Sequence, residues 1–111
     1  MTDKELLELA AKAADMRLNH AGQPTTGNYY DSADFIWNPL TDDGDALRLA
    51  VKLGVRGYFD VEIQKGSVQV TSFEPYEHTA YEEFKIRTED PHAAVRRAIV
   101  EAAAEIGRNH D

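Results

Sequence analysis

Cysteine is absent from the 111 residues, so disulfide bonds and thiolate metal ligands are excluded. Long apolar runs are also missing, since none approaches the roughly 20 residues of a membrane-spanning helix. The polar opening at residues 2–5 is unlike a secretory signal peptide. Basic residues are few: twelve Lys and Arg stand against twenty Asp and Glu, a formal net charge of −8. Because nucleic-acid affinity comes mainly from basic side chains that neutralise phosphates, we expect a cytoplasmic protein with no membrane partner and no direct nucleic-acid binding.

The acidic side chains that are present concentrate in two stretches without Lys or Arg. The first lies between Arg17 and Arg48, and the second between Lys65 and Lys85. The acids of these stretches are Asp31, Asp34, Asp42, Asp43, Asp45, Glu74, Glu77, Glu82 and Glu83. Local acidity of this kind favours solubility or attraction to a basic partner.

Helix signals occur at three places. A capping box of Thr2 and Glu5 predicts a helix over residues 3–18. A second helix is expected to start between 38 and 42 and to end at Gly54. For the third, Asp90 is the expected cap, Pro91 the first helical residue and Gly107 the end.

Alternation of apolar and polar residues predicts strands at 55–64, 68–73 and 80–87, with a tight turn at 65–66 and a bulge or change of face at Phe73. The expected fold class is α+β, with a three-stranded antiparallel meander packed with three helices in one domain, 1–111. The polar face of this sheet would carry Asp60, Glu62, Gln69, Glu83 and Arg87. The pattern leaves two arrangements open: two layers, or three α/β/α layers.

The stretch WNPLTDDGDALRLAVKL, residues 37–53, resembles a motif shared by small proteins of tailed bacteriophages and of prophages in Gram-negative bacteria. Those proteins also open like residues 2–14 and close on a helix like residues 91–103. Their layout is similar to the phage ABA-sandwich group, which implies helices flanking a small sheet. The resemblance brings no activity, cofactor or site residue. It implies an accessory protein, in the bacterial host cytoplasm, that binds and modulates host machinery, including defence systems.

Residue types that hold metals or perform catalysis occur without a matching arrangement. Asp42, Asp43 and Asp45 lack the spacing of a calcium loop, and we interpret them as carboxylates of a first helical turn. The histidines, which zinc sites use in close groups, are scattered at His20, His78, His92 and His110. No Gly-x-Ser-x-Gly elbow surrounds any serine. We therefore expect no enzyme, no metal and no cofactor.

Aromatic residues beside fixed charge are typical of protein interfaces. Trp37 is expected in the core, whereas Tyr29, Tyr30, Asp31 and Asp34 are predicted to bind a partner, together with Asp60, Glu62 and Glu83 of the sheet. The leading hypothesis is a non-catalytic protein whose acidic surface engages a basic host protein, as an anti-defence inhibitor or a nucleic-acid mimic. The alternative is a small-molecule-binding domain or minor enzyme, which a pocket of several hundred cubic ångströms between helices and sheet would favour. The oligomeric state stays open.

Overall fold

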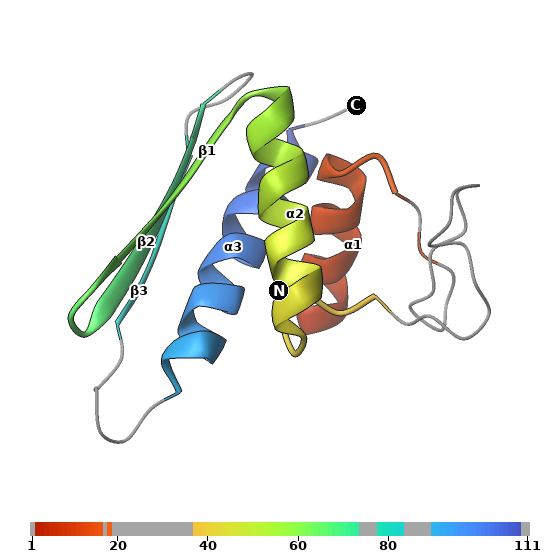
Figure 1. Cartoon of the computed structure of the whole chain (residues 1–111). Helices are drawn as coiled ribbons and strands as arrows, with labels where there is room; N and C mark the ends of the chain where they lie inside the picture. Colours follow the sequence, from red (N-terminus) through yellow and green to blue (C-terminus); the bar gives the residue numbers. More distant parts are fainter. Residues whose placement is uncertain (1, 17, 19–36, 74–77, 84–89, 110–111) are drawn as a thin grey trace.

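The structure, a computed structural model, describes residues 2–16, 18, 37–73, 78–83 and 90–109. Its elements in chain order are α1 (Asp3–Ala13), α2 (Asp43–Arg56), β1 (Tyr58–Gln64), β2 (Ser67–Phe73), β3 (His78–Glu83) and α3 (Pro91–Arg108). The strands form one antiparallel sheet in the order β1-β2-β3. The expected α+β fold, with a meander packed on three helices, is confirmed (Figure 1).

The helices begin where side chains satisfy free backbone N–H groups. At α1 the Thr2 hydroxyl accepts from the Glu5 N–H at 3.1 Å, and Glu5 accepts from the Thr2 N–H at 3.2 Å, which confirms the capping box. Asp42 caps α2 by accepting from the Asp45 N–H at 2.8 Å. Asp90 caps α3, and Pro91 follows as the first helical residue, as predicted.

The helix ends differ from the prediction. The first helix stops at Ala13 instead of Leu18, because Asp15 turns the chain with φ 56°. The second continues through Gly54 to Arg56 and ends at a Gly57 cap, so the first strand begins at 58 rather than 55. The third passes Gly107 and ends at Arg108.

The sheet turns between β1 and β2 at Lys65-Gly66, where Gly66 has φ 83°, and this confirms the predicted tight turn. The register is regular through the last residue of β2, since Phe73 pairs with Tyr58. Of the two alternatives predicted at Phe73, a bulge or a change of face, the bulge was therefore wrong. The inner face carries the row Val61–Val70–Ala80, as expected from the alternation.

The described helices lie on one side of the sheet (Figure 1). Strands β2 and β3 pack on α3, β1 packs on α2, and α1 packs on α3 behind this layer. Helices α1 and α3 approach so closely that a Cβ at Gly107 would overlap the Leu9 carbonyl. Among the described residues no helix covers the outer sheet face, so the described helices have the one-sided arrangement and not that of α/β/α layers. Trp37 is buried, as predicted.

Candidate partner-binding surface and groove

The outer face of the sheet brings together the three predicted acidic residues of the strands. Asp60, Glu62 and Glu83 are all exposed. In the register, Asp60 pairs with Thr71, Glu62 with Gln69, and Glu83 with Ser67, so the acids occupy three successive rows of one face. We call this surface the acidic face.

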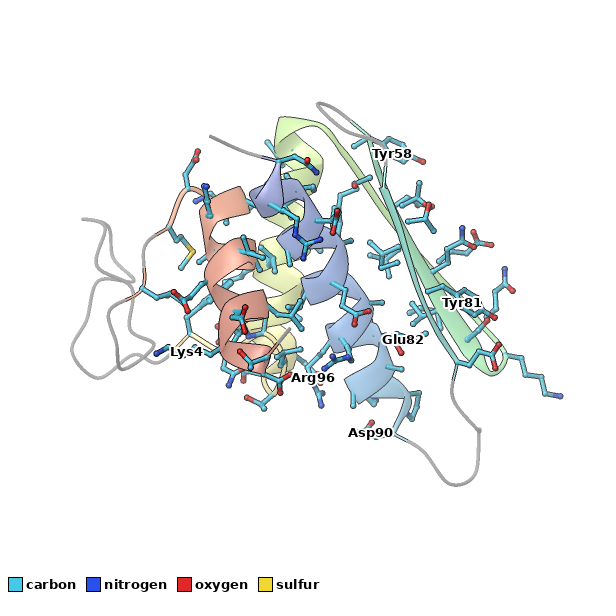
Figure 2. The ribbon with its side chains drawn as sticks, turned by 180° about the vertical axis from the view of Figure 1, so that it is seen from behind. Lys4, Tyr58, Tyr81, Glu82, Asp90 and Arg96 are labelled. Atoms are coloured by element: carbon cyan, nitrogen blue, oxygen red, sulfur yellow. The ribbon has the colours of Figure 1, made fainter. Side chains whose placement is uncertain are left out.

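Two tyrosines share the acidic face. Tyr81 continues the row of Glu62, and Tyr58 lies one row beyond Asp60. Their exposed fractions are 48% for Tyr58 and 54% for Tyr81, and Figure 2 shows both at the sheet, away from the helices. No Lys or Arg occurs in β1, β2 or β3. The arrangement supplies aromatic contact area next to the carboxylates of strands that contain no base. The tyrosines were not among the predicted site residues, although the alternation placed them on this face.

The other predicted contact residues, Tyr29, Tyr30, Asp31 and Asp34, lie outside the described residues, as does Arg87 of the predicted polar face. The structure therefore brings together only the sheet half of the predicted surface. The segment 29–34 stays a prediction.

A groove of about 500 Å³ opens between the inner face of β1 and the helices α2 and α3. The side chains that line it are mainly apolar: Ala46, Leu47, Ala50, Val61, Ile63, Pro91, Val95 and Ile99, joined by Asp43, His92 and Arg96. Leu47 is 64% exposed and Ile63 is 63% exposed. In the sequence Leu47, Val51 and Val55 recur at four-residue spacing as a second apolar stripe on α2, but Val51 and Val55 do not line the groove, so the stripe does not predict it.

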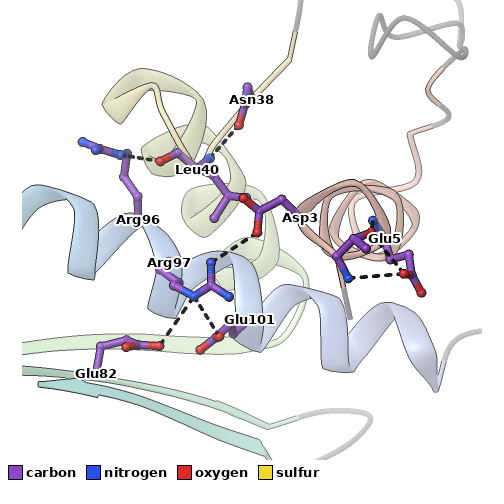
Figure 3. A network of polar contacts seen from close by, with 9 residues as sticks. Asp3, Glu5, Asn38, Leu40, Glu82, Arg96, Arg97 and Glu101 are labelled. Atoms are coloured by element: carbon purple, nitrogen blue, oxygen red, sulfur yellow. Dashed lines mark hydrogen bonds and ion pairs between the residues drawn. The ribbon is translucent and has the colours of Figure 1, made fainter.

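The charged side chains of the groove are already paired. Arg96 donates to the Asp43 carboxylate at 2.6 Å, which links α3 to the start of α2. It also donates to the Leu40 carbonyl at 2.8 Å, so it ties α3 to the segment before α2 (Figure 3). The hydrogen bond from Arg96 lowers the pKa of Asp43 below its ordinary value. His92 lies 3.5 Å from Asp43. Arg96 is thus committed to the fold and is not available as an anion-binding group.

The remaining aspartates of the first turn of α2 also act structurally. Asp45 is buried and accepts from the Asn38 N–H at 2.9 Å and from Arg48 at 2.6 Å. Together with the Asp42 cap, this confirms the interpretation of these residues as helix-start carboxylates. Among the described residues, no group of three or more His, Asp or Glu side chains is placed to hold a metal ion.

Glu82 and Glu83 lie on opposite faces of β3, as the alternation predicted. Glu82 faces α3 (Figure 2). There the Arg97 guanidinium is 4.0 Å from its carboxyl (Figure 3), and Glu101 is a hydrogen-bond partner. Burial, and then the hydrogen bond and repulsion from Glu101, raise the pKa of Glu82 to about 7, against a smaller opposing effect of Arg97. The pair was not predicted, although residue 82 shares the inward register of Ala80.

No protein-family model, curated protein or solved structure matches the chain. None of the described helices has the combination of length and hydropathy needed to cross a bilayer.

Proposed function

We propose that this chain is a non-catalytic binding protein whose acidic face engages a basic surface on another protein. The observation that carries the proposal is the outer face of the sheet, which no described helix covers, with Asp60, Glu62 and Glu83 in successive rows and no Lys or Arg in the strands. Exposed Tyr58 and Tyr81 supply the aromatic contact area that dominates binding energy at interfaces.

The proposed partner is a host protein in the bacterial cytoplasm, and the proposed role is that of a phage or prophage accessory protein. This part of the proposal rests on the resemblance of residues 37–53 to phage proteins. If the basic surface of the partner normally binds nucleic acid, the carboxylates act as stand-ins for phosphates. The segment 29–34 is proposed to extend the same surface.

The test is affinity capture from a bacterial lysate with the intact chain as bait, followed by mass spectrometry. Tyr81→Ala removes an exposed aromatic and is expected to weaken capture about tenfold or more, with an unchanged melting temperature. Val55→Ala is the matched control, because it removes an even more exposed apolar side chain from α2. It is expected to capture the partner as well as the wild type does. Tyr30→Ala tests the 29–34 segment in the same way.

Charge is tested separately. A double substitution Asp60→Asn and Glu62→Gln is expected to slow association and to flatten its salt dependence, because acidic side chains of this kind mainly steer encounter. Glu8→Gln, an exposed acid on α1, is the control. Equal binding by all these variants would contradict the proposal.

A second candidate function is a small-molecule-binding domain or minor enzyme. The groove of about 500 Å³ favours it, because its volume falls within the range of ligand sites. We rank it second because the charged side chains of the lining, which would orient a ligand, are paired with one another. Melting in the presence of a metabolite library discriminates the two: a ligand that raises the melting temperature of the wild type but not of a Leu47→Lys variant would favour the pocket.

A further inference from the structure

Strand β1 is an edge of the sheet. It pairs with β2 on one side, and among the described residues no strand pairs with its other side. Alternate N–H and C=O groups along β1 therefore point away from β2, to the side on which no described strand pairs, and there an added extended chain can pair with them.

The two edges of the sheet are not equivalent. The inward positions of β3 include Glu82, a carboxyl that faces α3, and an inward charge disfavours the addition of a strand. The inward positions of β1 are Phe59, Val61 and Ile63, which are all apolar. Proteins commonly protect an edge with such charges, and β1 has none on its inward side.

The inner side of β1 also lines the groove, together with α2 and α3. Val61 and Ile63 form its β1 wall, and Leu47 and Ala50 form its α2 wall. A strand added next to β1 would lie about 4.8 Å away and would direct alternate side chains to the same side as Ile63. These side chains would cover Ile63 and Leu47, which are exposed in the isolated chain.

Charge decides which strand can bind. The outward positions of β1 include Asp60 and Glu62 and no base. In an antiparallel pair with a second copy centred on Val61, Asp60 of each copy would lie opposite Glu62 of the other, and like charges directly opposite are destabilising. The same positions favour lysine or arginine on an added strand.

We propose that β1 accepts an extended segment of a partner protein as a fourth strand, in which apolar residues alternate with lysine or arginine. The apolar side chains fill the groove against Leu47 and Ile63, and the basic side chains lie beside Asp60 and Glu62. The inference rests on the proposed function, since it assigns the way in which the basic partner binds. Main-chain hydrogen bonds supply affinity, and the two alternating sets of side chains supply specificity.

The probe is a short synthetic peptide of alternating valine and lysine with blocked ends. Its binding to the intact chain is followed by fluorescence anisotropy, and amide hydrogen exchange of β1 is followed by NMR. We expect every second amide of β1, the set that points away from β2, to exchange more slowly when the peptide is bound. The matching valine–glutamate peptide is expected to bind at least tenfold more weakly, because its acids would face Asp60 and Glu62.

Two substitutions test the two sides of the strand. Leu47→Lys places a charge in the groove and is expected to weaken binding about tenfold. Val55→Lys is its control, because Val55 is on the same helix, is 82% exposed and does not line the groove. Glu62→Gln is expected to weaken binding about fivefold by removing a cross-strand ion pair, whereas Glu8→Gln on α1 is not.

The possible results distinguish strand addition at β1 from the proposed function of the acidic face. Strand addition is overturned if peptide binding requires Glu62 but does not slow exchange of the β1 amides and is unchanged by Leu47→Lys. That result would leave the acidic face as a binding surface. Failure of the valine–lysine peptide to bind at low salt also overturns strand addition. In that case the proposed function is still tested independently, by partner capture with the Tyr81→Ala and Asp60→Asn/Glu62→Gln variants.

Discussion

Glu82 lies between β3 and α3, where burial and the neighbouring Glu101 raise its pKa from an ordinary 4.5 to about 7. The folded chain therefore holds this proton more tightly than the unfolded chain. Below about pH 4.5 both states are protonated, and between about pH 4.5 and 7 only the unfolded state has released the proton. Stability is thus expected to fall as the pH rises through this window, and to level off above it.

The magnitude follows from the size of the shift. A difference of about 2.5 pKa units corresponds to at most about 3 kcal/mol. The Glu82 side chain keeps 28% of its surface exposed and has Arg97 at 4.0 Å, so water and the cation reduce the effect. We expect about 1 kcal/mol to remain.

The perturbation is Glu82→Gln, which keeps the shape and removes the charge. At pH 8 the variant is expected to be more stable than the wild type by about 1 kcal/mol, a rise of about 4 °C in melting temperature, and at pH 4.5 the two are expected to coincide. Urea denaturation at several pH values measures this directly. The control is Glu83→Gln, because Glu83 is the adjacent residue but is exposed on the acidic face.

Two results would refute the reasoning. One is a carboxyl titration of Glu82, followed by carbon NMR, that is centred near 4.5. The other is a Glu82→Gln variant that is less stable at pH 8, which would mean that the ion pair with Arg97 outweighs burial. Glu5 and Asp43 do not contribute to the pH dependence in this window. Because their pKa values are lowered, the stability that they provide is lost only as the pH falls below it.

Three further predictions concern the scaffold. Gly107→Ala is expected to lower the free energy of unfolding by about 3 kcal/mol, because the added Cβ would overlap a backbone carbonyl of α1. Gly54→Ala is expected to raise it by about 0.5 kcal/mol, because the nearest atom to the added Cβ is 3.8 Å away. Chemical denaturation measures both effects. Asp45→Ala removes a buried carboxylate and leaves the part-buried Asn38 N–H without its acceptor, and it is expected to cost about 2 kcal/mol. The exposed Asp43→Ala is expected to have a much smaller effect, as thermal melts would show. Addition of EDTA is expected to leave the melting temperature unchanged, and a drop restored by one specific ion would contradict this.

Helix starts could be predicted from the sequence because they depend on local chemistry. Thr2 with Glu5, and Asp90 with Pro91, specify their caps within a few residues, and the structure places the caps there. Helix ends were predicted less well. Gly54 is a strong stop signal by itself, but it lies inside α2 with room for a Cβ near Phe59, and the chain ends the helix at Gly57 instead.

The candidate site shows the same division. The acidic face follows from alternation alone, so Asp60, Glu62 and Glu83 were found. The groove depends on how far α2 stands from β1, a tertiary distance that no local pattern encodes, and Leu47 and Ile63 were therefore missed. The inward Glu82 lay in the predicted register, but its pairing with Glu101 required knowing that α3 crosses β3.

The packing of α1 on α3 has a consequence for synthesis. The helix at Asp3–Ala13 buries its apolar side against Pro91–Arg108, so residues 14–90 must be added before its partner helix exists. At about 10 residues per second this takes roughly 8 seconds. During that interval Leu6 and the buried alanines of α1 lack the helix against which they pack in the fold. Helix α2 and the three strands, which are close in sequence, can already form contacts with one another. The last turn of α3, where Gly107 meets α1, is therefore the last part of this packing to be synthesised.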